Sequence, residues 1–199
     1  MAVTLNANAL ISVAELDEIL QITIGDSDLS ATLINIASDF INNFTNRKIL
    51  SRTYTDEAYD GNNDCKIYLK QYPVTAVSTV KSWDTYNNEV SYTYTVYTEY
   101  LIYTDEGYIY IRGKTVPGHK NYRVTYTAGY VLVDVPYDLK NACAQLAGLV
   151  YYNKGKAGVK SETIGKYSIT YDKGDISVMG IPVPDDIAGV IRQYKKYNV

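Results

Sequence analysis

The 199-residue sequence has very few of the residues that most often carry out catalysis or bind metal ions. It contains one histidine, His119, and two cysteines, Cys65 and Cys143, which lie far apart in the chain. A zinc site needs about four nitrogen or sulfur ligands, and these three residues cannot supply them. No serine or cysteine forms a triad-like pattern with the single histidine. The sequence therefore predicts a protein that is not an enzyme and that holds no metal or cofactor.

Long apolar runs and an excess of positive charge are also missing. No segment approaches the roughly 20 apolar residues that cross a bilayer, and the N-terminus lacks the features of a secretory signal. The net charge of −3 gives no general attraction to nucleic acid. Charged residues make up 21% and hydrophobic residues 46%, as in ordinary folded chains. We expect a soluble cytoplasmic product whose cysteines are buried free thiols.

Two short strings resemble ligand-binding loops, but each lacks a required part. Asp60–Asp64 reads like the start of a calcium loop, yet the twelfth position falls at Gln71 and not at a glutamate. Gly155–Gly158 follows a predicted helix, whereas phosphate binds at the start of one. We interpret the first string as a turn and the second as part of a Gly/Lys-rich loop.

Tyrosine is the abundant residue, with 22 Tyr against 2 Phe and 1 Trp. Tyrosine covers apolar surface and keeps a polar tip, so it suits half-exposed sheets and interfaces. Its high β-propensity explains the same abundance without any contact role. The composition leaves both explanations open.

Helical periodicity marks both ends of the chain. Ser12 and Glu15 form a capping-box pattern before a short helix that ends near Leu20, and a second helix begins near Asp28. A long helix is predicted over residues 136–153, with Pro136 in its first turn, and a short C-terminal helix follows a Pro-rich hinge.

Between the helices the hydrophobic period changes to two, which predicts strands. Asp105–Gly107 is a hairpin signal between two of them. The predicted strands are Ser51–Tyr59, Lys66–Gln71, Val77–Trp83, Ser91–Tyr103, Tyr108–Arg112 and Arg123–Tyr126, with a lone late strand at Tyr167–Tyr171.

These patterns together predict an α+β fold, a helical bundle with an inserted Tyr-rich antiparallel sheet or small barrel. The predicted parts are a helical core from residues 1–48 and 131–153, a β region at 49–130, an extended arm at 154–183, and a C-terminal docking helix at 184–199.

One face of the long predicted helix carries small residues. Ala144 and Gly148 lie four residues apart, so a second backbone could approach there. A glycine inside a helix costs about 1 kcal/mol relative to alanine, and close packing would offset that cost. The partner could belong to the same chain or to a neighbouring subunit.

Several strings in a fixed order resemble the head-tail connector proteins of tailed bacteriophages, also described as adaptor or head-completion proteins. The strings are Ser12–Leu20, Asp28–Leu50 (with Ile36–Ile41 and Thr45–Arg47), Leu69–Val74, Val77–Val80, Val124–Tyr130, Val135–Lys140, Ser161–Gly165 and Tyr167–Ile169. The resemblance spans most of the chain. The Tyr-rich insertion, Ser51–Tyr126, is larger than in the mostly helical members.

The resemblance implies a structural virion protein of the head-tail interface, or neck, assembled in the host cytoplasm. It would form a ring of about twelve copies beneath the portal protein. The ring would extend the channel for double-stranded DNA, without binding it specifically, and would receive the stopper or a tail-completion protein. The implied partners are further copies of the chain, the portal and the stopper, and no membrane.

Two sets of candidate contact residues follow. The candidate subunit interface comprises Ala144, Gly148, Ser161, Glu162, Ile164, Tyr167, Ile169 and Tyr171. The candidate portal-docking set comprises Ile187, Ile191, Arg192, Tyr194, Lys195 and Lys196. Each set also has an explanation that involves no partner. The arm could be a surface loop, and the final helix could cover the core of its own chain. An alternative function is a carbohydrate- or surface-binding β module of a phage tail or baseplate.

Overall fold

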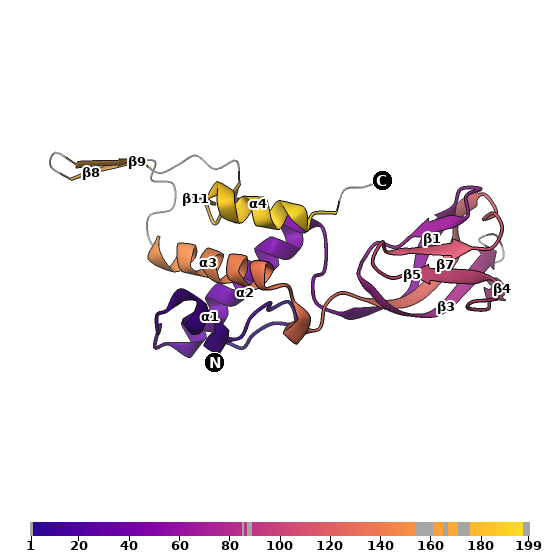
Figure 1. Cartoon of the computed structure of the whole chain (residues 1–199), viewed down its shortest axis with the longest axis horizontal. Helices are drawn as coiled ribbons and strands as arrows, with labels where there is room; N and C mark the ends of the chain where they lie inside the picture. Colours follow the sequence, from indigo (N-terminus) through magenta and orange to yellow (C-terminus); the bar gives the residue numbers. More distant parts are fainter. Residues whose placement is uncertain are drawn as a thin grey trace. The chain divides into compact units, whose positions relative to one another are not determined.

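The computed structural model describes residues 2–84, 86, 89–153, 161–164, 167–170 and 176–196. Helices and antiparallel sheets are both present, so the predicted α+β class is confirmed (Figure 1). The chain separates into two compact units. One unit comprises Met1–Ile49 and Leu132–Val199, and the other comprises Leu50–Val131.

The first unit contains the helices. They are α1 (Val13–Leu20), α2 (Ser27–Thr45), α3 (Tyr137–Tyr152) and α4 (Asp185–Gln193), with a 3-10 turn at Leu132–Asp134. The capping box of α1 forms as predicted, with both bonds between Ser12 and Glu15. Pro136 is the N-cap of α3 and precedes its first turn. The predicted C-terminal helix is shorter than expected, because residues 194–196 lie beyond its end.

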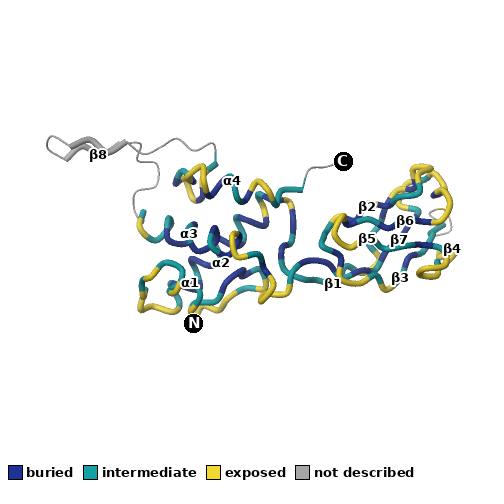
Figure 2. The backbone as a smooth tube through the Cα atoms, in the orientation of Figure 1, coloured by how far each residue is buried: buried dark blue, intermediate teal, exposed yellow. Residues whose placement is uncertain are grey.

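The core of this unit forms where α3 packs beside α2 and α1. Ser38 of α2 lies 3.4 Å from the Cys143 sulfur of α3, and burial raises the pKa of that thiol to about 12. Lys140 of α3 bridges to Glu15 of α1 at 2.8 Å. Figure 2 shows the buried stretches along α2 and α3. Cys143 is buried as expected, whereas Cys65 is only half-buried, and both are free thiols.

The second unit contains two sheets that share one core. Its strands are β1 (Arg52–Gly61), β2 (Lys66–Tyr68), β3 (Val74–Asp84), β4 (Glu89–Tyr94), β5 (Tyr100–Tyr103), β6 (Tyr108–Ile111) and β7 (Gly118–Ala128). They form antiparallel sheets in the orders β1-β7-β3-β4 and β2-β6-β5. The core between them includes Tyr59, Ile67, Val80, Tyr100, Ile109, Tyr122, Val124 and Tyr126.

One predicted strand, Ser91–Tyr103, is two strands in the structure. A turn at Thr95–Glu99 separates β4 from β5, and Tyr97 in this turn adopts a φ of 63°. The carboxylate of Glu99 accepts bonds from the Thr95 amide at 2.7 Å and from the Tyr92 hydroxyl at 2.6 Å. This turn contains no glycine or proline, so the usual turn signal is missing. The predicted hairpin at Asp105–Gly107 is confirmed, because Tyr103 pairs with Tyr108.

The late strand is not alone, which corrects the prediction. β9 (Tyr167–Thr170) pairs antiparallel with β8 (Ser161–Ile164) in a two-stranded sheet. A second small pair follows, β10 (Ser177–Val178) with β11 (Ile181–Pro182), before α4 begins. β8 contains only one apolar residue, Ile164, and so shows no alternation, whereas Tyr167 and Ile169 alternate with polar residues in β9.

Candidate interaction site

The small-residue face of α3 packs inside its own chain. Gly148 is buried, and a Cβ atom built on it would lie 3.2 Å from both Cδ atoms of Leu20 in α1. Ala144 has no exposed surface. The atoms that approach Gly148 therefore belong to the Leu20 side chain, and not to a second backbone as the sequence suggested. This geometry favours packing within the chain over a contact between subunits.

The candidate residues of the arm fall on the β8–β9 pair. Ser161, Glu162 and Ile164 belong to β8, and Tyr167 and Ile169 belong to β9. The register places Glu162 opposite Ile169 and Ile164 opposite Tyr167. The remaining candidate, Tyr171, lies outside the described residues. An isolated two-stranded sheet is marginally stable in water, so a further contact would stabilise this pair.

The candidate portal-docking residues divide into a buried and an exposed group. Ile187 and Ile191 are 7% and 1% exposed and face the core of their own unit. Arg192 is exposed. The apolar side of α4 thus covers its own core, and only the polar side of the helix is open to a partner.

The residues after α4 return to the helical unit. The Tyr194 hydroxyl donates to the Asp138 carboxylate, and the Tyr194 carbonyl accepts a bond from Arg47 at 3.2 Å. The Lys195 ammonium lies 5.0 Å from the centre of the Phe44 ring, and the Lys196 amide donates to the Thr45 carbonyl at 2.8 Å. Three of the candidate docking residues therefore hold the end of the described chain against α2 and α3.

A groove of about 110 Å³ lies between α3 and α4. It is lined by Asp138, Asn141, Ala142 and Gln145 of α3 and by Asp186, Ile187 and Val190 of α4. Among these residues only Ile187 was a candidate contact residue from its sequence pattern, because the groove exists only once the two helices pack together. We refer to it as the α3–α4 groove.

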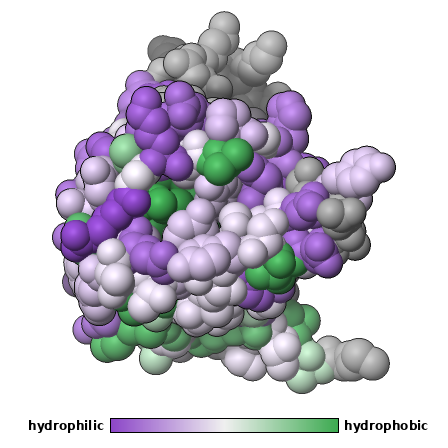
Figure 3. Space-filling view, turned by 90° about the vertical axis from the view of Figure 1, so that its right-hand side faces the viewer, coloured by the Kyte–Doolittle hydropathy of each residue, from purple (hydrophilic) through white to green (hydrophobic). Residues whose placement is uncertain are grey.

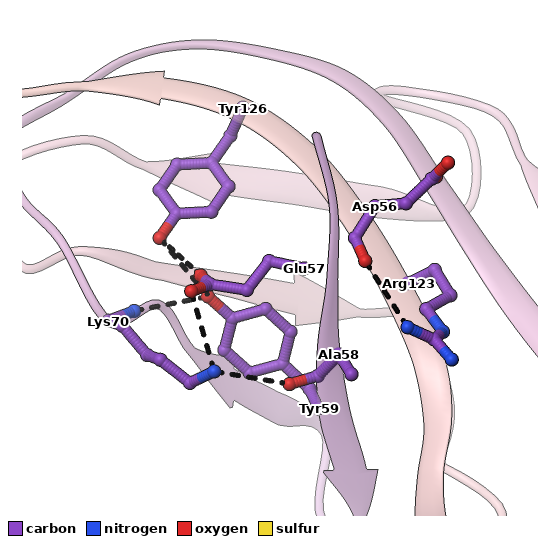
Figure 4. A network of polar contacts seen from close by, with 7 residues as sticks. All are labelled: Asp56, Glu57, Ala58, Tyr59, Lys70, Arg123 and Tyr126. Atoms are coloured by element: carbon purple, nitrogen blue, oxygen red, sulfur yellow. Dashed lines mark hydrogen bonds and ion pairs between the residues drawn. The ribbon is translucent and has the colours of Figure 1, made fainter. Parts of the chain in front are cut away.

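In the β unit, Glu57 organises a polar network inside the sheet (Figure 4). Its carboxylate accepts bonds from the hydroxyls of Tyr59 and Tyr126, the latter at 2.7 Å, and pairs with Lys70 at 3.4 Å. A bulge brings it there, because Tyr54 pairs with Tyr126 and Glu57 already pairs with Val124. Burial is the main cause that raises the pKa values of Tyr59 and Tyr126. The network joins β1 to β7 and to Lys70, and we expect it to stabilise the fold.

The outer face of the β2-β6-β5 sheet carries a row of tyrosines. Tyr103 and Tyr108 stack with ring centres 4.4 Å apart, and Tyr68 lies 5.6 Å from Tyr108. Lys66 adds a cation 4.6 Å from the Tyr108 ring. The rings of Tyr103 and Tyr108 therefore cover each other. On the face seen in Figure 3, hydrophobic residues form separate patches among hydrophilic and intermediate ones.

The described part of the chain offers little chemistry for a reaction or a metal. His119 is highly exposed, and its Nδ1 lies 3.5 Å from Asp60. Across those residues, no three His, Cys, Asp or Glu side chains gather closely enough to hold a metal ion. None of the helices in this part combines the length and apolar character of a membrane-spanning segment.

Comparison with known proteins gives the family and the fold. The model of the head completion protein family matches residues 9–197. No curated protein matches the chain. Three solved chains are similar in fold to this chain. Each match covers 100% of this chain and 96% of the solved chain. A chain of "Virion of native gene transfer agent (GTA) particle" is 20% identical with a TM-score of 0.59.

The other two chains come from descriptions of a particle neck. One is "Neck of empty GTA particle computed with C6 symmetry", at 18% identity and a TM-score of 0.56. The other is "Neck of native GTA particle computed with C12 symmetry", at 19% identity and a TM-score of 0.55. At these identities the likeness establishes a shared fold.

Proposed function

The chain belongs to the head completion protein family, and from this premise we propose that it is a structural protein of the neck between head and tail in a phage-like particle. The family match over residues 9–197 carries the proposal. The similar chains in neck assemblies support it, because they have this fold along their full length. The role is architectural and needs no catalytic group.

In this proposal the chain forms a ring beneath the portal protein. The neck structures with C6 and C12 symmetry support a ring of repeated copies. A closed ring uses one heterologous contact repeated around an axis, so each copy must present two different surfaces. The ring would extend the DNA channel and offer its far side to the stopper or tail-completion protein.

The charge of the chain suits a channel through which DNA must slide. A basic lining would bind phosphates and release counterions, which slows movement. The net charge here is −3. We therefore expect no specific DNA binding.

We place the contacts between subunits on the arm and the portal contact on the exposed side of α4. The arm strands contain Ser161, Glu162, Ile164, Tyr167 and Ile169, and Tyr171 follows them. Ala144 and Gly148 are left out of the subunit interface because they are buried in their own chain. On α4, Arg192 is the exposed candidate for the portal.

The test is negative-stain electron microscopy of the purified chain, alone and mixed with its cognate portal. We expect the purified chain to form rings, or the portal in the mixture to gain an additional tier of density. Chains that stay monomeric and never join a portal at micromolar concentration would overturn the neck proposal.

A second candidate is a carbohydrate- or surface-binding module that uses the tyrosine row. Exposed Tyr68 on the β2-β6-β5 face favours it. Sugar recognition by stacking needs an open ring face, and Tyr103 and Tyr108 occupy each other's faces. The test is titration with a panel of glycans, monitored by the NMR chemical shifts of the tyrosines. The binding module predicts shifts on glycan addition, and the neck role predicts none.

A further inference from the structure

The α3–α4 groove combines an apolar floor with an acidic rim. Ala142 and Ile187 are 3% and 7% exposed and form its buried part. Asp138 and Asp186 are exposed on its rim. Asn141 and Gln145 are the other polar lining residues, and no lysine or arginine lines the groove.

The two carboxylates stand at opposite ends of the groove. Tyr194, just after α4, contacts Asp138 at the start of α3, so the two helices run antiparallel. Asp138 and Asp186 each lie in the first turn of their helix. Asp138 already accepts from Tyr194, whereas Asp186 forms no ion pair with any described residue.

This combination fits one class of side chain. Lysine and arginine lay an apolar stem along apolar surface and keep a charged head in a polar setting. A stem over Ala142 and Ile187 would bring the cation to one of the two rim carboxylates. An anion would meet two carboxylates, and a purely apolar group would leave them unpaired.

The chain itself contains a segment with the matching charge. Residues 154–170, here called the basic segment, hold four lysines and one glutamate, a net charge of +3. The whole chain has a net charge of −3, so the rest carries −3 − 3 = −6. Copies packed in a ring would repel one another through that charge, and the basic segment offsets it.

We propose that the α3–α4 groove of one copy receives a lysine side chain from the basic segment of a neighbouring copy. The inference rests on the proposed ring, because it supplies one of the contacts that repeat around the ring. The contact also gives the β8–β9 pair, which lies within the basic segment, a surface on which to be stabilised.

The experiment is carbodiimide cross-linking of the full-length assembly, prepared from equal amounts of nitrogen-14 and nitrogen-15 chains. The reagent joins a lysine amine to a carboxylate as an amide, with loss of water, and mass spectrometry then identifies the pair. Mixed-isotope peptides that join the basic segment to Asp186 or Asp138 are expected. Same-isotope peptides alone would mean that the segment folds onto its own chain, and links only to other acids would place it elsewhere; either result overturns the proposal.

A matched pair of variants makes the test independent of cross-linking. Asp186→Lys should cause a severalfold loss of assembly, whereas Asp185→Lys, in the same helical turn but outside the groove, should not. Reversing the four lysines to glutamate should cause the same loss, and combining this change with Asp186→Lys should restore part of it. Rings that form equally well with Asp186→Lys and with a variant that also carries Asp138→Lys would contradict the groove contact and leave the neck role intact. An unaltered chain that forms no ring, either alone or on the portal, would remove both.

Discussion

The hydroxyl of Tyr194 donates to both carboxylate oxygens of Asp138, at 2.7 and 2.9 Å. The bond joins the residue that follows α4 to the first turn of α3. A partner that pulled residues 194–196 away from the helical unit would have to break it. The end of the described chain therefore acts as a clasp between α3 and α4, on the side of the groove where Asp138 lies.

Tyr194→Phe should loosen this clasp. Loss of one exposed hydrogen bond to a carboxylate is expected to lower the free energy of unfolding by about 0.5–1.5 kcal/mol. Urea denaturation followed by circular dichroism gives the value, and amide exchange at residues 194–196 should become faster. Tyr137→Phe is the matched control, because the Tyr137 side chain is exposed and bonds to no described residue. Equal effects of the two changes would contradict the clasp.

Arg192→Glu should weaken binding to the portal. Arg192 is exposed on α4, so the change replaces one positive surface charge with a negative charge. A loss of about 1 kcal/mol, or about fivefold in affinity, is expected for one such charge. Adding Lys195→Glu and Lys196→Glu should weaken binding further, although the first also removes the contact with Phe44. Biolayer interferometry against purified portal measures each step, and unchanged affinity would remove α4 as the portal contact.

Glu57→Ala should destabilise the β unit. The change leaves the hydroxyls of Tyr59 and Tyr126 without their common acceptor in a buried setting. A loss of about 1–3 kcal/mol is expected, because Tyr59 still donates to the Tyr126 hydroxyl at 3.2 Å, whereas the Tyr126 hydroxyl is left without an acceptor. Glu57→Gln keeps an acceptor oxygen and should cost less. Glu106→Ala, at an exposed turn position, should change the urea midpoint very little. A Glu57→Ala midpoint equal to that of Glu106→Ala would show that the network contributes nothing.

The parts of the fold that the sequence predicted are those determined by neighbouring residues. The capping box joins Ser12 to Glu15 three residues away, and the hairpin at Asp105–Gly107 has a glycine turn signal. The turn at Thr95–Glu99 escaped prediction because a carboxylate shapes it. Glu57 escaped for a related reason: the bulge after Tyr54 moves it to the core face and breaks the period of two.

The candidate site depends on contacts between distant residues, and a sequence pattern cannot supply them. The small-residue face of α3 was visible, but its partner Leu20 lies 128 residues before Gly148. Asp138 and Val190 line the same α3–α4 groove, although they lie far apart in the sequence. Only the packing of the two helices places them there. The apolar pattern of α4 predicted a buried face without saying which surface it covers.

Gly148→Leu should destabilise the monomer, because the added side chain would meet Leu20. Overpacking of this kind lowers the free energy of unfolding by about 1–3 kcal/mol. Gly189→Ala is the matched change in α4, where a Cβ would meet nothing within 4 Å. It should stabilise the helix by about 0.5–1 kcal/mol. Urea denaturation at a concentration where the chain is monomeric measures both. A Gly148→Leu monomer of unchanged stability would reopen the subunit-interface interpretation of this face.

Alkaline pH should unfold the β unit through Tyr59 and Tyr126. Burial, with the Glu57 carboxylate close by, raises their pKa values in the folded state above the ordinary tyrosine value of about 10. Below pH 10 both states keep the phenol protons, so this contribution to stability is fully present. Above it, the unfolded chain releases protons that the folded chain retains, and stability falls as the pH rises. Tyr59 and Tyr126 should therefore ionise only together with unfolding, and absorbance at the tyrosinate band should show this as a late phase. In a Tyr59→Phe and Tyr126→Phe double variant the alkaline loss of stability should be smaller, relative to its own stability at pH 8. An unchanged pH profile in that variant would mean that other groups control the alkaline transition.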